Sequence, residues 1–272
     1  MSDFADRYGP WALVAGASDG VGSAMAEELA RRGLNVVLLA RRQEVLDEVA
    51  AGITAHTGAQ TRTLAIDLAA PAAAGEVIAA TEDLEIGFLV YCAGADPNFQ
   101  PFLSSPLSDA ESLVQRNCLV PMQLCHHYAQ PMVERGRGGI VIFGSGAGFA
   151  GGPNMVAYGA SKAFDMVFAE ALWTELQPSG VDVLGLILGK TDTPALRKLE
   201  HERGQIPSPE DAPPGAAAVD DVVAAAFANL TEGPTCLVGP EIQAAAQLMA
   251  SVSRNDAVRF IAQAVTSAMG AN

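Results

Sequence analysis

Short apolar runs alternate with amphipathic helical stretches from the first residues to about residue 240, and this alternation constrains the fold more than any other feature. Parallel strands buried on both faces have this apolar, β-branched character, and helices supply the crossovers that join them. Between the first two runs, Val21, Met25 and Leu29 recur every four residues, and Gly33 follows as a helix stop. We therefore expect one doubly wound α/β domain over residues 1–272, with a mostly parallel seven-stranded sheet whose strands lie at 11–15, 35–40, 63–66, 86–91, 140–143, 181–188 and 235–238.

Two segments depart from the alternation. Residues 190–216 contain five prolines and follow the end of the sixth run, where ligands bind in such sheets. A mobile surface loop is one interpretation and a helical lid over a substrate pocket is the other, which the position favours. The second segment is a C-terminal helical extension over residues 240–272, with helical patterns at 241–250 and 255–269. These helices could cover a sheet edge, close the pocket or pair subunits, and the sequence does not choose between these roles.

The composition excludes some classes of partner. The chain has 16 basic and 31 acidic residues, a formal charge of −15, so we expect neither nucleic acid nor an anionic membrane surface as a partner. Its longest apolar stretches fall far short of the ~20 residues of a membrane span, and the first residues show no export signal, which predicts a cytoplasmic protein. No metal site is expected, because the cysteines and histidines lack ligand spacing: Cys92, Cys118, Cys125, Cys236, His56, His126, His127 and His201.

A glycine-rich turn joins the first apolar run to the helical pattern after it. Glycine lets a backbone turn sharply and approach a pyrophosphate closely, and a helix N-terminus offers that anion free N–H groups and partial positive charge. Such a turn alone is a weak signal, but strand, turn, helix and N-terminal position here all agree with a nucleotide site. The turn residues expected to bind the cofactor are Gly16, Ser18, Asp19, Gly20, Val21 and Gly22.

The end of the second run indicates which nucleotide binds. A cofactor with a free ribose 2′-hydroxyl favours a carboxylate at this position, whereas this chain has Ala40 followed by Arg41 and Arg42. Arginine binds a 2′-phosphate through charge-assisted hydrogen bonds, and two cations are poorly placed if they merely begin a helix. We expect Arg41 to be the main ligand and Arg42 to support it, so that NADP(H) is preferred and NAD(H) is possible. Asp19 in the phosphate turn counts mildly against this preference.

The third and fourth runs end in Asp67-Leu68 and in Cys92-Ala93-Gly94. In a doubly wound sheet both of these strand ends border the same crevice. We expect Asp67 to accept a hydrogen bond from the adenine amine and Gly94 to leave room for the adenosine ribose. Taken singly, each motif is equally compatible with ordinary turn chemistry.

The groups expected to react follow the fifth run, which ends near Ser145. Tyr158 comes thirteen residues later in a helical stretch, and Lys162 lies four residues beyond it, on the same helix face. A free tyrosine, with a pKa near 10, is a poor base at neutral pH, but a nearby ammonium favours the phenolate. The tyrosine could then exchange a proton with a carbonyl or alcohol oxygen held by the serine, while a nicotinamide exchanges a hydride with the carbon.

With these motifs the chain resembles the short-chain dehydrogenase/reductase family over about residues 9–240. The resemblance rests on AGASDGVG (15–22), CAG (92–94), Asn117, Ser145, Tyr158-x-x-x-Lys162 and Gly189-x-x-x-Thr193. It implies a Rossmann-type oxidoreductase domain and a catalytic tetrad. In that tetrad Tyr158 is the acid/base, Lys162 binds the nicotinamide ribose and lowers the pKa of Tyr158, Ser145 orients the substrate oxygen, and Asn117 holds a water that links Lys162 to solvent.

The same resemblance implies further cofactor contacts and an assembly. Thr193 would bind the nicotinamide carboxamide, and the segment around it would line the nicotinamide end through Leu188, Gly189 and Thr191. Helices near residues 105–134 and 156–177 would pair subunits, which implies a homodimer or a homotetramer. The sequence departs from the family pattern at Ala15, at Tyr91-Cys92 and at Leu188, and none of these departures removes a reacting group.

The sequence therefore predicts an NADP(H)-dependent oxidoreductase that acts on a small-molecule ketone/secondary-alcohol pair. The local sequence looks most like the NADPH-using 3-ketoacyl and 17β-hydroxysteroid reductase branch, which implies a bulky, hydrophobic substrate. A nucleotide-bound sensor without turnover is one alternative, but its tetrad would be broken and this one is complete. A nucleotide-sugar epimerase or dehydratase is another, and the glycine spacing and the small C-terminal region argue against it.

Overall fold

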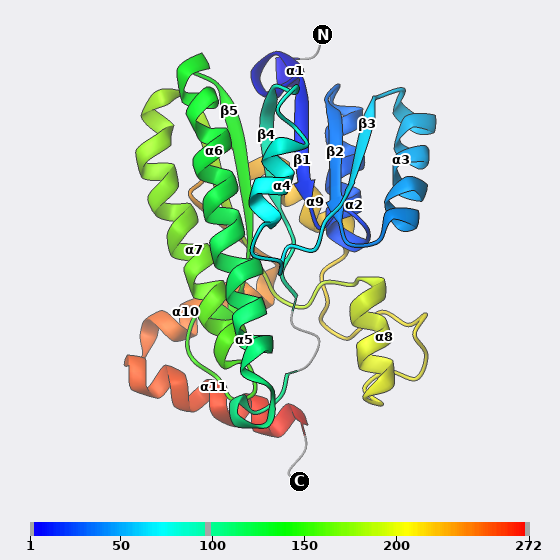
Figure 1. Cartoon of the computed structure of the whole chain (residues 1–272). Helices are drawn as coiled ribbons and strands as arrows, with labels where there is room; N and C mark the ends of the chain where they lie inside the picture. The colour runs from blue at the N-terminus through cyan, green and yellow to red at the C-terminus, as the bar shows by residue number, and fades with distance from the viewer. Residues whose placement is uncertain (1–2, 96–98, 270–272) are drawn as a thin grey trace.

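A computed structural model describes residues 3–95 and 99–269. Seven parallel strands form one sheet in the order β3-β2-β1-β4-β5-β6-β7, so the predicted doubly wound α/β fold is confirmed (Figure 1). The strands are β1 Trp11–Ala15, β2 Asn35–Ala40, β3 Thr61–Ala65, β4 Ile86–Tyr91, β5 Gly138–Ser145, β6 Val181–Leu188 and β7 Thr235–Val238.

Five of the seven strand boundaries agree with the sequence prediction and two differ. Strand β3 begins at Thr61 and ends at Ala65, where the prediction was 63–66. Strand β5 is longer at both ends than the predicted 140–143, because its flanking glycines and Ser145 pair with β6 along its whole length. Sheet pairing, rather than side-chain preference, extends this strand to the serine.

Helices connect the strands and continue beyond the last of them. The α-helices are α1 Asp3–Tyr8, α2 Gly20–Arg31, α3 Gln43–Thr57, α4 Ala73–Ala79, α5 Leu107–Val114, α6 Val120–Arg135, α7 Val156–Leu176, α8 Pro194–Glu202, α9 Val219–Asn229, α10 Pro240–Ser251 and α11 Arg254–Met269. A π-helical turn, η2 Gln115–Leu119, joins α5 to α6, and a 3₁₀ turn, η3 Gly146–Gly148, follows β5. Within the described residues no helix has the length and apolar character needed to cross a membrane.

The core is divided by the sheet into two layers, because successive side chains of a strand point to opposite faces. On β1, Ala12 and Val14 pack with α2, α3 and α9, whereas Leu13 and Ala15 pack with α4, α6 and α7. The predicted helical repeat is confirmed, since Val21, Met25 and Leu29 are buried in the first layer. The chain therefore buries both faces of the sheet, as a parallel sheet requires.

The strand order places a crevice at the carboxyl ends of β1 and β4. From β1 the chain builds outward through β2 and β3 in one direction, and from β4 it builds outward in the other. Ligands bind at this switch point in doubly wound sheets. The carboxyl ends point toward the side of the molecule where α8, α10 and α11 lie (Figure 1).

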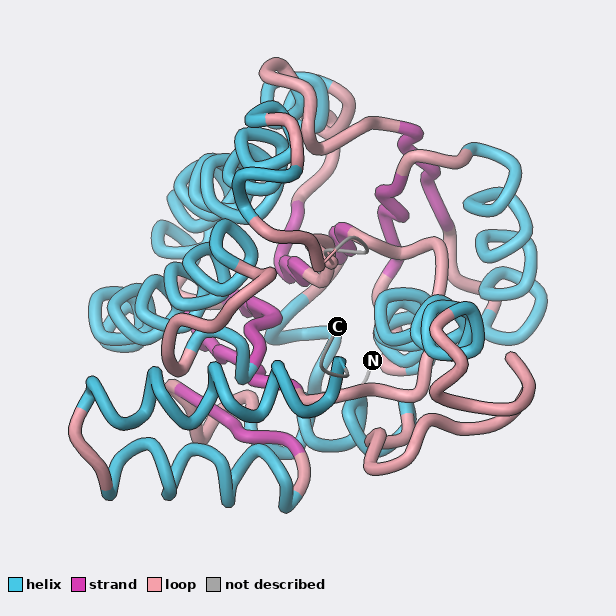
Figure 2. The backbone as a smooth tube through the Cα atoms, turned by 90° about the horizontal axis from the view of Figure 1, so that it is seen from below, coloured by secondary structure: helices cyan, strands magenta, loops and turns pink. Residues whose placement is uncertain are grey.

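The C-terminal extension packs against the loop that follows β5. Seen from below, α10 and α11 form a pair of helices on one side, and α8 lies on the other (Figure 2). A Cβ atom built on Gly146 or on Gly189 would lie within 3 Å of the Ile242 side chain, and one on Gly152 would lie 2.7 Å from Ile261. Helix α10 also contacts the edge strand β7. The extension thus covers the sheet edge at β7 and packs on the glycines that follow β5 and β6, whereas closing a pocket and pairing subunits stay predictions.

Candidate active site

The glycine-rich turn has no room for larger side chains. Gly16 adopts φ +90°, a left-handed conformation that favours glycine, and a Cβ there would lie 2.9 Å from the backbone nitrogen of Ala93. A Cβ on Gly22 would collide with the carbonyl oxygen of Gly16. The turn therefore brings β1, the start of α2 and the end of β4 close together. Backbone atoms rather than side chains line this glycine cradle (residues 16–22), which fits a pyrophosphate.

The predicted ligands Ser18, Asp19 and Val21 in this turn have side chains in different surroundings. The Asp19 carboxylate caps α2 by accepting a hydrogen bond from the Gly20 nitrogen at 2.7 Å, so its charge is stabilised by the helix terminus. Ser18 is half-buried beside it. The Val21 side chain packs in the core, which leaves only its backbone to face a phosphate.

The two arginines after β2 are exposed and unpaired. Neither the Arg41 nor the Arg42 side chain has a hydrogen bond or an ion pair with any described residue, whereas arginines such as Arg62 and Arg197 pair with carboxylates. In a chain with a formal charge of −15, two exposed cations without acidic partners among the described residues are available to an anion. Their position at the end of β2 agrees with the predicted 2′-phosphate site.

The segments after β3 and β4 leave the sheet at its carboxyl edge, the edge of the phosphate turn. Asp67 is exposed and its Oδ1 accepts a hydrogen bond from the Ala69 nitrogen at 3.0 Å, whereas the Leu68 side chain is buried in the core. The Cys92 nitrogen donates to the Ala15 carbonyl oxygen at 3.0 Å, which ties the end of β4 to the phosphate turn. Asp67 can therefore offer a carboxylate to a nucleotide, while Leu68 can offer only its backbone.

Asn117 is fully buried in the π-helical turn between α5 and α6. Its Nδ2 donates to the Gly94 carbonyl oxygen at 3.1 Å and to Ser161 Oγ at 2.9 Å. Gly94 has φ +127°, and a Cβ on it would lie 2.6 Å from Asn117 Oδ1, so this approach requires glycine. Asn117 thus connects the CAG segment to α7, the helix that carries Tyr158.

The turn η3, which follows Ser145, packs closely on α7, the helix that carries Tyr158. Ser145 ends β5, and its Oγ accepts a hydrogen bond from the Ala147 nitrogen at 3.2 Å. A Cβ on Gly148 would lie 2.7 Å from the Ala163 nitrogen, and one on Gly159 would lie 3.0 Å from the Ala147 oxygen. These glycines let the serine loop lie directly on the first turns of the tyrosine helix.

Lys162 lies on the same helix face as Tyr158, with its Nζ 6.0 Å from the centroid of the tyrosine ring. The ammonium also donates to the Phe143 carbonyl oxygen at 2.9 Å and pairs with Asp165 Oδ2 at 2.9 Å. The sequence analysis missed Asp165. The available signal was an acidic residue three positions after Lys162 on a mostly apolar helix.

Phe99, which the sequence analysis also missed, lies edge-on to Tyr158, with the two ring centroids 6.0 Å apart. Its φ of +46° is unusual for a residue with a side chain. The Arg203 guanidinium lies 5.4 Å from the centroid of the Phe99 ring. Arg203 belongs to the 190–216 segment. This segment therefore contacts the Phe99 ring, which in turn contacts Tyr158.

The segment after β6 returns to the phosphate turn. A Cβ on Gly20 would lie 2.8 Å from Cγ2 of Thr193, whose Oγ1 caps α8 by accepting from the Leu196 nitrogen at 3.2 Å. Thr191 pairs with Ala217 in an isolated parallel bridge that closes the base of the segment. Its buried Oγ1 has no hydrogen-bond partner among the described residues, an orphaned polar atom that a bound cofactor would satisfy. Leu188 is half-buried and Gly189 is exposed beside it.

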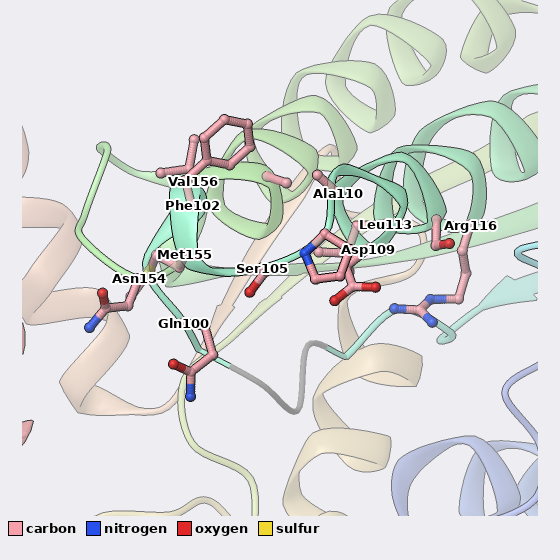
Figure 3. A pocket seen from close by; sticks show the side chains of 13 residues that line it. Gln100, Phe102, Ser105, Asp109, Ala110, Leu113, Arg116, Asn154, Met155 and Val156 are labelled. Carbon is pink, nitrogen blue, oxygen red and sulfur yellow. The ribbon is translucent and has the colours of Figure 1, made fainter.

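A pocket of about 200 Å³ borders the site where α5 meets the segment before α7. Gln100 and Phe102 reach it from the loop after β4, Asp109 and Arg116 from α5 and η2, and Met155 from the start of α7 (Figure 3). Its lining contains none of the four tetrad residues. The part of the chain that the structure describes holds no group of three or more His, Cys, Asp or Glu side chains arranged for a metal ion.

Comparison with known proteins extends these observations. A family model described as short chain dehydrogenase matches residues 10–204. The chain is 34% identical over 256 residues to a 7beta-hydroxysteroid dehydrogenase of Clostridium sardiniense, an alignment that covers 94% of this chain and 95% of the relative. It is 34% identical over 204 residues to a very-long-chain 3-oxoacyl-CoA reductase of Aspergillus clavatus, covering 74% of this chain and 59% of the relative.

Solved structures give the same result. One, from a study of 7beta-hydroxysteroid dehydrogenase stereoselectivity, has a TM-score of 0.86 at 30% identity and covers 96% of this chain and 99% of that chain. A short-chain dehydrogenase from Sphingobium yanoikuyae in complex with NADPH has a TM-score of 0.73 at 32% identity, covering 90% and 96%. Since the family model spans most of the chain and these relatives share its whole architecture, the chain belongs to the short-chain dehydrogenase family and is an oxidoreductase that acts on CH–OH groups.

Proposed function

We propose that the protein is an NADP(H)-dependent oxidoreductase that interconverts a ketone and a secondary alcohol, with Tyr158 as the acid/base. The observation that carries the proposal is the position of Lys162 Nζ, 6.0 Å from the centroid of the Tyr158 ring. The serine loop packs on the same helix, and the glycine cradle lies at the same end of the sheet. A tyrosine, an ammonium and a hydroxyl at one site suit proton transfer to or from a carbonyl oxygen.

In the proposed reduction, the Tyr158 hydroxyl donates its proton to the carbonyl oxygen of the substrate, while Ser145 Oγ holds that oxygen by a hydrogen bond. The bound nicotinamide supplies the hydride. Lys162 stabilises the phenolate that remains, because its ammonium lies on the same helix face. Asn117 holds α7 in register with the CAG segment through Ser161 and Gly94. In oxidation each proton moves in the opposite direction.

The proposed preference for NADP(H) is supported by the two unpaired arginines at the end of β2. Arg41 and Arg42 would hold the 2′-phosphate, the turn from Gly16 to Gly22 would hold the pyrophosphate, and the segment from Leu188 to Thr193 would line the nicotinamide. The complex of the Sphingobium yanoikuyae relative with NADPH supports the same assignment.

We also propose a bulky, hydrophobic substrate. The Phe99 ring beside Tyr158 supplies apolar surface at the site. The side chains of Ile242 and Ile261, which pack against Gly146 and Gly152 in the loop after Ser145, supply more. The names of the relatives point the same way, since one acts on a hydroxysteroid and another on a very-long-chain 3-oxoacyl thioester. Apolar pockets with a few placed polar groups are typical of sites for such ligands.

A panel of carbonyl compounds tests the proposed function. Keto-steroids, 3-oxoacyl thioesters and small ketones are mixed with NADPH or NADH, and the absorbance of the reduced nicotinamide is followed. Hydroxysteroids with NADP⁺ test the reverse direction. We expect turnover with a bulky apolar substrate and faster turnover with NADPH than with NADH. Loss of signal with every compound in both directions would overturn the proposal.

A homodimer or homotetramer remains our proposal for the assembly. Large apolar side chains are exposed on the helices that the resemblance implicates in subunit pairing, namely Leu107, Val114, Val156 and Val167. Exposed apolar patches of this kind mark association surfaces. Sedimentation of the purified protein measures the assembly, and the predicted cytoplasmic location can be tested by cell fractionation.

Residues 190–216 are proposed to act as a substrate lid. Arg203 contacts Phe99, and Phe99 contacts Tyr158, so closure over a substrate would order this segment. Ordering a segment lowers its open population, so proteolytic cleavage within 190–216 is expected to slow when NADPH and substrate are bound. Limited proteolysis with mapped fragments measures the rate, and cleavage elsewhere in the chain is the internal control. Equal rates with and without ligands would make the segment a plain surface loop.

A further inference from the structure

Asp165 lies one helical turn after Lys162 and is buried with it. Its Oδ2 lies 2.9 Å from Lys162 Nζ, and the two side chains are only 3% and 6% exposed. Its second oxygen, Oδ1, has no hydrogen-bond partner among the described residues. A buried carboxylate with one oxygen unsatisfied is costly to maintain, so its presence beside a reacting lysine calls for a functional explanation.

Lys162 has three N–H donors, and two of them are engaged before any ligand is considered. One donates to the Phe143 carbonyl oxygen and one to Asp165, each at 2.9 Å. One donor is left for the cofactor ribose. The side chain is therefore fixed in direction by β5 and by its own helix, and its positive charge is balanced at contact distance.

Three thiols and one phenol near this pair are held neutral. Burial raises the pKa of Cys92 and of Cys125 to about 12, that of Cys118 to about 11, and that of Tyr91 well above its usual range. Cys118 lies in η2, which packs against α7, whereas Tyr91 ends β4, Cys92 follows it and Cys125 lies on α6. Burial also raises the pKa of Asp165, and the Lys162 charge opposes that rise.

Two further charged side chains, Asp109 of α5 and Arg116 of η2, line the pocket beside Val156 and Ala157 in the first turn of α7. Arg116 Nη2 donates a hydrogen bond to the Ala95 carbonyl oxygen at 2.8 Å. Asp109 is exposed and Arg116 is half-buried, whereas Lys162 and Asp165 are buried, so the charges of this pair are the least screened by solvent near Tyr158.

We propose that Asp165 is a positioning residue that holds Lys162 and offsets its charge, so that Tyr158 stays protonated to a higher pH than the lysine alone would allow. This inference rests on the proposed function of Tyr158 as the acid/base. Reduction requires the protonated tyrosine and oxidation requires the phenolate. Asp165 therefore extends reduction toward alkaline pH and confines oxidation to higher pH, without changing the overall equilibrium.

Removal of the Asp165 charge is expected to let Tyr158 ionise at lower pH. Asp165→Asn keeps the side-chain volume and removes the negative charge, so the Lys162 ammonium favours the phenolate unopposed. Tyr158 and Asp165 are two helical turns apart, about 10 Å along the axis. At that distance a unit charge shifts a titration by about one pH unit in a partly screened site. In the pH profile of kcat/KM, the acidic limb for oxidation and the alkaline limb for reduction are both expected to shift to lower pH by about that amount.

The experiment compares pH profiles of the full-length protein and three variants. Asp165→Asn should move both limbs, whereas Asp165→Glu, which keeps the charge, should restore them toward the native profile. Asp182→Asn is the matched control, because it removes a buried carboxylate that pairs with Arg7 at the start of β6, the end of the sheet remote from the site. Its profile should not move. Unmoved limbs in Asp165→Asn, or equal shifts in Asp182→Asn, would overturn the inference.

A second measurement does not depend on turnover. Ultraviolet difference titration of each protein against its Tyr158→Phe counterpart reports ionisation of that tyrosine alone. We expect the ionisation to occur at lower pH once Asp165 is replaced by Asn, and Asp165→Leu supplies the neutral variant if the Asn protein does not fold. An unchanged titration would overturn the inference. If no substrate is turned over but the titration still moves, the proposed function fails and the charge-balancing role of Asp165 is retained.

Discussion

Tyr158→Phe is expected to lower turnover of a ketone with NADPH by at least ~10²-fold, the low end of what general acid/base catalysis contributes. The substitution removes the hydroxyl that donates the proton and leaves the ring, which packs beside Phe99, in place. Because the glycine cradle and the arginines lie on other elements, NADPH binding should survive. Steady-state rates from nicotinamide absorbance, together with fluorescence titration of NADPH, measure the two quantities separately.

Tyr128→Phe is the matched control. Tyr128 is buried in the core layer on the α7 side of the sheet, and its hydroxyl lies 2.6 Å from Thr81 Oγ1, where it has no role in the proposed reaction. Loss of that hydrogen bond should lower the free energy of unfolding by about 1 kcal/mol and leave turnover near normal. Near-normal turnover in Tyr158→Phe would remove Tyr158 from the mechanism.

Replacing the two arginines at the end of β2 should reverse the cofactor preference. Each charge-assisted hydrogen bond to the 2′-phosphate is worth ~1.5–3 kcal/mol, so Arg41→Ala should weaken NADPH binding by roughly 10- to 100-fold or more. NADH lacks that phosphate and should be little affected. Arg42 is equally exposed and unpaired among the described residues and can take over part of the contact, so the Arg41→Ala/Arg42→Ala double variant is the fairer test.

Adding Ala40→Asp should move the preference further toward NADH, because a carboxylate repels the phosphate and accepts a hydrogen bond from a free 2′-hydroxyl. Arg62→Ala on the neighbouring strand β3 is the control, since it removes one surface cation that pairs with Asp83 rather than a ligand. Dissociation constants for both cofactors measure the ratio. The assignment fails if the native protein binds NADH as tightly as NADPH, or if the double variant leaves the ratio unchanged.

Local features of the sequence determined the order of elements and the candidate reacting groups. The helical repeat of Val21, Met25 and Leu29 and the apolar runs reflect which residues face the core, and this depends on near neighbours along the chain. The i,i+4 spacing placed Tyr158 and Lys162 on one face for the same reason. The glycines of the phosphate turn were recognisable because only glycine permits that turn.

Contacts between segments far apart in the chain required the tertiary structure. Ile242 packs against Gly146 and Gly189, and Arg203 reaches Phe99, because docking of α10 and of the 190–216 segment brings them there. No periodicity encodes such pairings. Asp165 is an intermediate case, since its spacing from Lys162 was visible in the sequence. Only the packing of α7 against β5 and η2 showed that this face is buried. Because the Lys162–Asp165 pair is buried, solvent screens its charges little, and they can act on Tyr158.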